Sequence, residues 1–130
     1  MEKKKIILDC DPGIDDALAL MLALSSPELD ICGITTVSGN VPAELGADNA
    51  LRVLQFMNRL DIPVYCGAEK PLVRGYVGAQ DTHGEDGLGE SGILPAEGAA
   101  WHPGAVDFIL DTLQKTESLT IVAIGPLTNL

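Results

Sequence analysis

The chain has 130 residues, of which 46% are hydrophobic, and its mean hydropathy is +0.22. These values fit one folded domain with a buried core and exclude a disordered protein. The formal charge of −11 argues against nucleic-acid and anionic-membrane partners, because both bind basic surfaces. No stretch reaches the roughly 18 to 20 consecutive apolar residues of a membrane span, and the N-terminal lysines lead into a strand pattern instead of a signal peptide. We therefore expect a cytoplasmic protein.

The most informative stretch reads LDCDPGIDDALAL and covers residues 8–20. The apolar run at its start predicts a buried strand over Ile6–Cys10, which the Pro-Gly pair that follows must end. The segment Ala17–Leu24 is apolar all round and consists of strong helix formers, so it predicts a buried helix that Asp15 or Asp16 opens and caps. The local structure predicted here is a strand, a tight turn and a helix.

Four carboxylates crowd around this turn: Asp9, Asp11, Asp15 and Asp16. The alternation of strand side chains and the tight turn allow at least three of them to converge. Like charges held together raise one another's pKa unless a positive group lies between them, and no Lys or Arg occurs between Lys5 and Arg52. A hard divalent cation such as Ca²⁺ or Mg²⁺ would resolve this repulsion, since it takes oxygen ligands. The structural alternative is that one aspartate caps the helix and the others are stabilised by the helix dipole.

The remaining chain alternates between strand and helix patterns. Strands are predicted over Leu29–Val37, Pro63–Cys66 and Leu119–Ile124, and helices over Ala43–Arg59 and Ala105–Lys115. From Gly67 to about Pro103 the pattern lapses into a long glycine-rich loop, which in a compact domain is usually functional or disordered. The predicted fold is a single α/β domain over residues 1–130, with an open, mostly parallel sheet and helices on both faces. Ligand sites in such sheets lie at the carboxyl ends of the strands.

Three cysteines, Cys10, Cys32 and Cys66, lie far apart in sequence within or at the end of strand-like runs. This spacing favours reduced, buried thiols over a structural zinc site, which needs closely paired ligands.

The motif DCDPGIDDALAL resembles the N-terminal signature of the nucleoside hydrolases, the inosine-uridine-preferring family that cleaves ribonucleosides with a bound Ca²⁺. Three further segments match in order: TTVSGN at 35–40, KPL at 70–72 with HG at 83–84, and GPLTN at 125–129. The resemblance covers essentially the whole chain and implies a Rossmann-like nucleoside hydrolase core. Because members of the family are considerably longer, it also implies that residues 1–130 are the N-terminal part of a longer domain, with the C-terminal part absent.

The resemblance assigns roles to individual residues. Asp11 and Asp16 would ligate Ca²⁺ together with the backbone carbonyl of Ile124, and Asp11 would also be the general base for the Ca²⁺-bound water. Substrate contacts are implied for three residues: Asp15, Asn40 and His83. The products would be ribose and a free base, and the carboxylates would stabilise the positive charge that develops on the ribose.

The residues alone leave other interpretations open. Asn40 equally suits a turn or a cap before the next helix, and composition alone favours simple solvent exposure for His83. A haloacid-dehalogenase-type phosphotransferase with Mg²⁺ also carries two acids spaced like Asp9 and Asp11, but the hydroxyl residue expected after the second acid is missing. Receiver domains of response regulators need a phosphorylatable Asp after the third strand, where this chain has YCG at 65–67.

A last alternative is an inactive fragment. In the family, a further Asp ligand and a His that assists the departing base come from the C-terminal part, and no residue of this chain can take those roles. Such a fragment would bind Ca²⁺ weakly and hydrolyse nothing. An unpaired strand edge and exposed apolar surface would favour self-association, and we expect a homo-oligomer.

Overall fold

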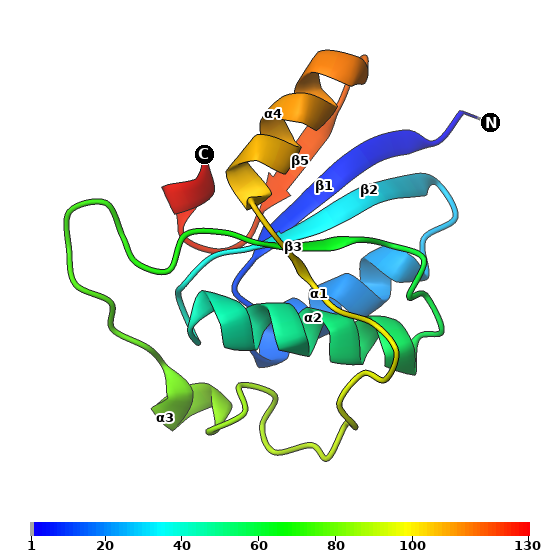
Figure 1. Ribbon diagram of the computed structural model, residues 1–130. Coiled ribbons are helices and arrows are strands. Elements are labelled where there is room, and N and C mark those ends of the chain that lie inside the picture. The colour runs from blue at the N-terminus through cyan, green and yellow to red at the C-terminus, as the bar shows by residue number, and fades with distance from the viewer. Residues whose placement is uncertain (1) are drawn as a thin grey trace.

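The computed structural model describes residues 2–130 and shows a parallel sheet flanked by helices (Figure 1). Within these residues the sheet has five strands in the order β4-β3-β2-β1-β5, and each neighbouring pair is parallel. The strands are β1 (Lys4–Cys10), β2 (Leu29–Thr36), β3 (Val64–Cys66), β4 (His102–Pro103) and β5 (Thr120–Ala123). The helices are α1 (Ile14–Leu24), α2 (Ala43–Phe56), α3 (Gln80–His83) and α4 (Ala105–Lys115), and a 3₁₀ turn, η1, spans Leu127–Asn129.

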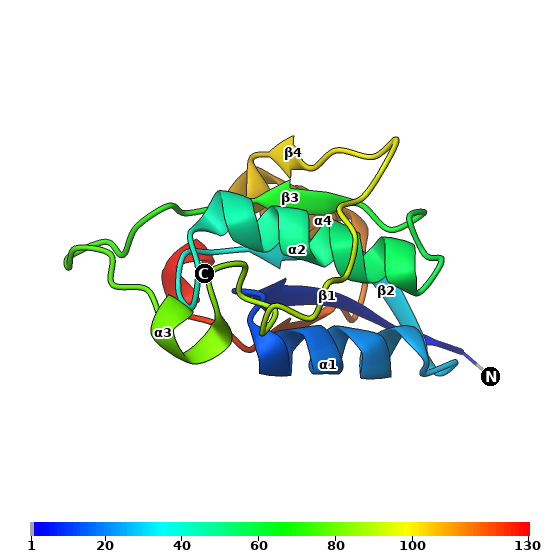
Figure 2. The same cartoon turned by 90° about the horizontal axis from the view of Figure 1, so that it is seen from below.

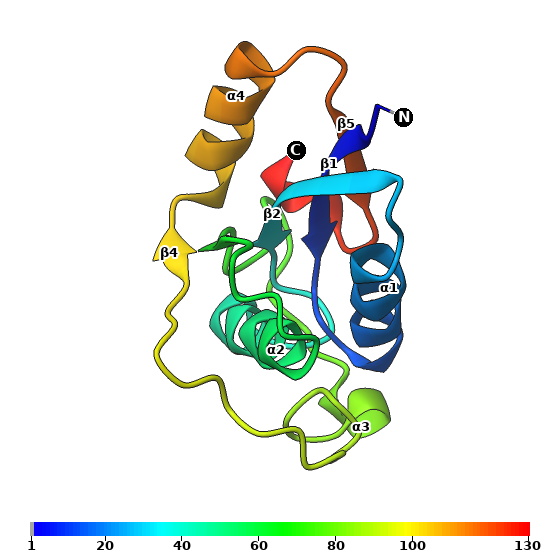
Figure 3. The ribbon, with the colours of Figure 1, turned by 90° about the vertical axis from the view of Figure 1, so that its right-hand side faces the viewer.

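The predicted fold class is confirmed: the sheet is open and parallel, and helices lie on both of its faces. Helices α1 and α2 cover one face and α4 covers the other, as Figures 1 and 3 show. Because the strands are parallel, their carboxyl ends lie along one edge of the sheet. We call this the carboxyl edge; it comprises the strand ends and following residues at 9–11, 36–40, 66–68 and 124–125.

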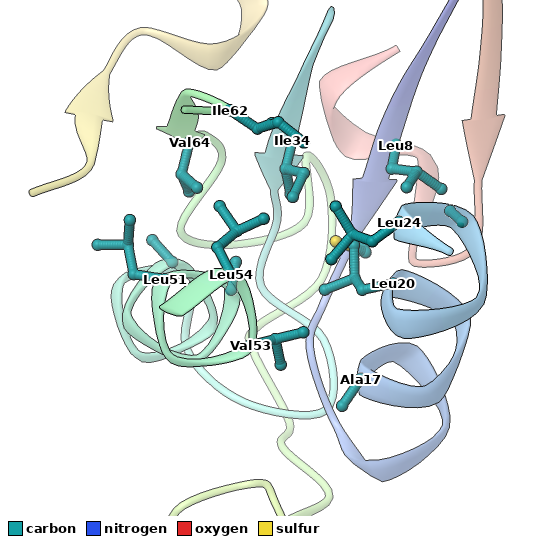
Figure 4. Packing of buried hydrophobic residues seen from close by; sticks show 14 of the residues in the cluster. Leu8, Ala17, Leu20, Leu24, Ile34, Leu51, Val53, Leu54, Ile62 and Val64 are labelled. Carbon is teal, nitrogen blue, oxygen red and sulfur yellow. The ribbon is translucent and has the colours of Figure 1, made fainter. Parts of the chain in front are cut away.

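A hydrophobic core lies between the sheet and the helices α1 and α2 (Figure 4). Alternate strand residues share a face, so Ile6, Leu8 and Cys10 of β1 all belong to this core. Leu20 from α1 and Leu54 from α2 pack into it and are completely buried. Full burial of one such leucine contributes about 1.5–3 kcal/mol. The core thereby fixes α1 against β1, and with it the turn that carries the motif carboxylates.

Helix α1 begins earlier than the sequence predicted, at Ile14. Its N-cap is Gly13, whose backbone is extended, and no side chain makes a capping hydrogen bond there. Asp15 and Asp16 lie in the first helical turn, where the helix dipole favours negative charge. The prediction of an aspartate cap is therefore wrong.

The segment from Gly67 to about Pro103 contains two short elements that the sequence did not predict. Helix α3 is one turn, and β4 has two residues that pair with Tyr65 and Cys66 of β3. Elements this short carry no readable periodicity, and the pairing of β4 depends on a neighbour far away in sequence. Figure 2 shows the chain passing from α3 along α2 to β4.

Helix α4 packs on the opposite face of the sheet through Phe108, whose ring stacks on Tyr65 with 4.1 Å between the ring centroids. Gly33 in β2 makes room for this ring, because a Cβ there would lie 2.6 Å from Phe108 Cζ. None of the helices formed by residues 2–130 is long and apolar enough to cross a membrane.

Candidate functional site

The turn between β1 and α1 places the motif carboxylates at the carboxyl edge. Strand β1 ends at Cys10, and only three residues separate it from α1, which begins at Ile14. The fold buries three of the four motif carboxylates: Asp9, Asp11 and Asp16. The fourth, Asp15, is exposed on the first turn of α1.

Asp11 is held by residues that follow β2 and β5. Its Oδ2 accepts a 2.7 Å hydrogen bond from the backbone N–H of Asn40, whose side-chain amide donates to the Asp11 carbonyl at 3.3 Å. Two glycines allow this close approach. A Cβ on Gly125 would lie 2.8 Å from Asp11 Oδ1, and a Cβ on Gly39 would overlap Oδ2. The structure thus brings Asn40 to Asp11 and packs the carboxylate between the ends of two strands.

The Asp16 side chain reaches back from α1 to Asp11. Its Oδ2 accepts a 3.0 Å hydrogen bond from the Asp11 backbone N–H. Burial raises the pKa of Asp16 to about 8, and the hydrogen bond to the Asp11 carboxyl group and its negative charge add to this increase. Two acids that share a buried position in this way favour a proton or a cation between them.

Asp9 belongs to a different cluster. It is completely buried, and its Oδ1 accepts hydrogen bonds from Thr35 Oγ1 at 2.6 Å and from Asn129 Nδ2 at 2.8 Å. Burial raises the pKa of the Asp9 carboxyl group above its ordinary value. Its Oδ2 is buried and has no hydrogen-bond partner among residues 2–130.

The structure does not gather three of the motif carboxylates into one metal-holding group. Among the described residues, no group of three or more His, Cys, Asp or Glu side chains is arranged to hold a metal ion. Asp9 is still part of the β1 ladder, where β2 and η1 hold its side chain, whereas Asp11 lies beyond the strand end and pairs with Asp16.

His83, at the end of α3, is docked against the turn that precedes α1. Its Nδ1 accepts a 3.0 Å hydrogen bond from the Ile14 backbone N–H, so this nitrogen carries no proton. A Cβ on Gly13 would lie 2.6 Å from His83 Nδ1 and 2.9 Å from Asn40 Nδ2, so both side chains lie against this glycine. The interpretation of His83 as a simply solvent-exposed loop residue is therefore wrong, because the ring is half-buried and bonded to the motif.

Ile124 follows β5 and lies next to the motif strand. Its backbone N–H donates to the Asp9 carbonyl at 2.9 Å, which continues the pairing of β1 and β5. The next residue, Gly125, lies directly against Asp11, as the distance from its hypothetical Cβ shows. The end of β5 therefore reaches the carboxyl edge beside Asp11, although the two are more than 110 residues apart in sequence.

Sequence reasoning interprets Asn49, which resembles a family position, as a helix-packing contact, and it gives Asn129 no role of its own in the site. Asn49 Nδ2 donates to the Pro12 carbonyl at 3.2 Å and to the Asp86 carbonyl at 2.7 Å, and so joins the motif turn to the glycine-rich loop. The sequence feature that could have indicated the role of Asn49 is a polar residue beside the apolar positions of α2. Asn129 ends the GPLTN segment and bonds to Asp9, but nothing local in the sequence indicates that partner.

The carboxylate oxygens of Asp11 and Asp16 are of the ligand type that hard cations bind. Carboxylates and backbone carbonyls are the ligands that Ca²⁺ and Mg²⁺ prefer, and a cation would neutralise the repulsion that raises the Asp16 pKa. Ca²⁺ takes about six to eight oxygen ligands, so two carboxylates and a carbonyl from Ile124 would supply part of the set.

The chain belongs to the inosine-uridine preferring nucleoside hydrolase family, whose profile matches residues 6–130. The family resemblance of the motifs is therefore confirmed. It favours the nucleoside hydrolase hypothesis over the phosphotransferase and receiver-domain alternatives.

Individual relatives support the same assignment. An uncharacterized protein of Schizosaccharomyces pombe is 49% identical over 129 residues, which are 97% of this chain and 41% of that protein. The pyrimidine-specific ribonucleoside hydrolase RihA of Escherichia coli is 47% identical over 125 residues, 95% of this chain and 40% of its own length. The solved structure of a purine-preferring ribonucleoside hydrolase from Gardnerella vaginalis matches with a TM-score of 0.90 at 37% identity, over 97% of this chain and 42% of that one.

The chain thus spans about 40% of the length of the curated relatives it matches. Two of the similar proteins are named for opposite base preferences, pyrimidine for RihA and purine for the Gardnerella enzyme. Similarity at this level does not distinguish between the two classes of base.

Proposed function

We propose that this chain forms the N-terminal part of a ribonucleoside hydrolase that cleaves the N-glycosidic bond and releases ribose and a free base. The observation that carries the proposal is the buried pair of Asp11 and Asp16, held at the carboxyl edge beside Asn40 and the end of β5. Ligand sites of open α/β sheets lie at this edge. Family membership supports the reaction class.

The proposed metal site consists of Asp11, Asp16 and the backbone carbonyl of Ile124, with Ca²⁺ as the ion. When bound, Ca²⁺ would supply positive charge that lowers the pKa of a water molecule and orients it. Asp11 would take the proton from the attacking water, because its Oδ1 is not used by the Asn40 N–H and faces Gly125.

Three further residues would contact the nucleoside. Asp15 is exposed on the first turn of α1, where its carboxylate would accept hydrogen bonds from the ribose hydroxyls. Asn40 would orient the water or the ribose. The Nδ1 of His83 accepts the Ile14 N–H, so the ring would present Nε2–H toward the departing base.

The negative charge of this edge suits the reaction. Cleavage of the N-glycosidic bond develops positive charge on the ribose, and buried carboxylates stabilise it more strongly than water would. The sequence carries 19 acidic and 8 basic residues, so a neutral nucleoside approaches without the electrostatic penalty that an anionic substrate would meet.

The second candidate is a chain that binds Ca²⁺ weakly and does not hydrolyse nucleosides. It is favoured by one observation: among residues 2–130 no third His, Cys, Asp or Glu side chain joins Asp11 and Asp16 in a group that could hold a metal ion. A cytoplasmic location and a homo-oligomeric assembly stay predictions, and we also propose a role in nucleoside catabolism and salvage.

Calorimetric titration with Ca²⁺ tests the metal site. We expect Asp11→Ala and Asp16→Ala each to abolish binding, because each removes a charged ligand from a site with few others. Asp30→Asn is the matched control, since it removes an exposed acid at the opposite end of the sheet, where β2 begins, and should leave the affinity unchanged. Parental affinity in both alanine variants would remove the metal assignment.

A hydrolysis assay separates the two candidate functions. Inosine and uridine are offered to this chain and to a longer form, with and without Ca²⁺, and release of free base is measured. Activity in either protein that requires Asp11 supports the hydrolase. Ca²⁺ binding without base release in both proteins would favour the second candidate.

A further inference from the structure

Asn129 joins four separate parts of the carboxyl edge. Its Nδ2 donates to Asp9 Oδ1 at 2.8 Å and to the Thr36 carbonyl at 2.9 Å, and its Oδ1 accepts from the Ala68 N–H at 2.9 Å. Asp9 lies near the end of β1, Thr36 ends β2, and Ala68 follows β3, while Asn129 itself belongs to η1 after β5. We call these three hydrogen bonds the asparagine clasp.

The residues of the clasp are buried and closely packed. Asn129 is 5% exposed, and Asp9 and Thr36 are completely buried. A Cβ on Gly67 would overlap the Asn129 side chain, so glycine at this position lets the amide reach the strand ends. Thr35 Oγ1 donates a second hydrogen bond to the same Asp9 oxygen at 2.6 Å.

The clasp also determines the path of the chain after β5. The Ile124 N–H bonds to the Asp9 carbonyl, and Asn129 bonds to the Asp9 side chain, so the four residues between Ile124 and Asn129 are attached to Asp9 at both ends. Gly125 lies within this short span and packs against Asp11. A span fixed at both ends has little freedom to move its carbonyl groups.

We propose that Asn129 is a positioning residue: through Asp9 it holds the end of β5 so that the Ile124 carbonyl is presented to the cation shared by Asp11 and Asp16. The inference rests on the proposed function, because it concerns the same metal site. Its role is indirect, since the side chain bonds to Asp9 and to backbone groups and not to the proposed ligands. Residues that orient metal ligands in this way typically contribute about 10–100-fold to metal affinity.

Two variants of the 130-residue chain test this role. Asn129→Ala removes all three hydrogen bonds, and Asn129→Asp keeps the size and the acceptor for Ala68 but places an oxygen against Asp9 Oδ1. We expect Ca²⁺ affinity, measured by calorimetry with CaCl₂ alone, to fall by about 10–100-fold in both. We also expect the amides of Ile124 and Gly125 to exchange hydrogen faster than in the parent.

Val53→Ala serves as the matched control for stability. Val53 is completely buried in α2, belongs to the hydrophobic core and takes no part in the hydrogen bonds of the clasp, so its truncation should lower the unfolding temperature and leave Ca²⁺ affinity at the parental value. Asn129 variants that lose stability as this control does but bind Ca²⁺ with parental affinity would overturn the positioning role.

The same experiment distinguishes this inference from the proposed function. A parent chain that binds no Ca²⁺ contradicts the proposed metal site. The clasp is then judged by hydrogen exchange alone: faster exchange at Ile124 and Gly125 in both Asn129 variants, with Val53→Ala unchanged there, supports it, and unchanged exchange refutes it.

Discussion

The carboxyl edge and the glycine-rich loop after β3 meet at the same turn but are held by different contacts. At the edge, buried side chains bond to one another and to strand backbone, as Asp9 does with Thr35 and Asn129. The loop is instead attached by polar side chains of α2 that donate to its carbonyl groups, such as Arg52 to Ile93.

The polar side of α2 is therefore more than a solvated surface. Asn49, Arg52 and Gln55 are spaced three residues apart, so they lie along one side of the helix, and each donates to a carbonyl of the loop. Most of these bonds lie at partly exposed positions, where one hydrogen bond contributes about 0.5–1.5 kcal/mol. The hydrogen bonds at the edge are buried, whereas most of those from α2 to the loop are not, and the loop is anchored in addition by Leu88, which is buried in the core.

The largest change in the free energy of unfolding should come from adding one methyl group at the carboxyl edge. Gly39→Ala would place a Cβ over Asp11 Oδ2, which is already bonded to the Asn40 N–H, so we expect a loss of about 1–3 kcal/mol in the free energy of unfolding. The control is Gly75→Ala in the loop, where a Cβ meets nothing within 4 Å and the backbone is not left-handed. That variant should change the free energy by no more than about 0.5 kcal/mol, as urea denaturation can measure. Equal losses of unfolding free energy in Gly39→Ala and Gly75→Ala would contradict the stated difference between the carboxyl edge and the loop.

The second expected effect is a dependence of stability on pH, which comes from the buried pair Asp11 and Asp16 at the carboxyl edge. The pKa of Asp16 is about 8 in the folded chain against 3.8 for an ordinary aspartate. The folded state therefore keeps a proton that the unfolded state releases, so in the metal-free chain the contribution of Asp16 to stability is greatest below about pH 4 and falls as pH rises toward about 8. Thermal unfolding in EDTA across this range should show the decrease.

Asp16→Asn should flatten this pH profile, because the amide does not titrate. Part of the slope should remain, since burial also raises the pKa of Asp9. Asp30→Asn, which removes an exposed acid, should keep the parental slope. A profile in Asp16→Asn as steep as in the parent would show that another group is responsible.

The smallest effect on stability should come from releasing the loop. His83→Ala removes the hydrogen bond to the Ile14 N–H, which lies at an exposed position, so the unfolding free energy should fall by about 0.5–1.5 kcal/mol at most. Amides of residues 79–90 should nevertheless exchange hydrogen faster. The control is Thr82→Ala, an exposed neighbour in the same turn. If Thr82→Ala loosens the loop to the same degree, the histidine contact is not what attaches it.

The sequence by itself determined the main elements and the site motif. Hydrophobic periodicity located four strands and three helices to within a few residues, because burial of one face imposes a readable pattern. The motif DCDPGIDD identified the family and brought Asp11 and Asp16 forward as a pair, since a strand end, a Pro-Gly turn and a helix start are local features. Asn40 and Ile124 followed from strand direction, because parallel strands end at the same edge.

Only the tertiary structure decided which carboxylates belong together. Asp9 and Asp11 are two residues apart and look equivalent in the sequence, yet Asp9 bonds to Asn129, 120 positions away, whereas Asp11 pairs with Asp16. The docking of His83 on Ile14 and the short strand β4 likewise depend on partners distant in sequence. Local patterns record the period of a helix or strand, but a buried polar group takes whichever partner the packed fold supplies, and that choice leaves no trace in the neighbouring residues.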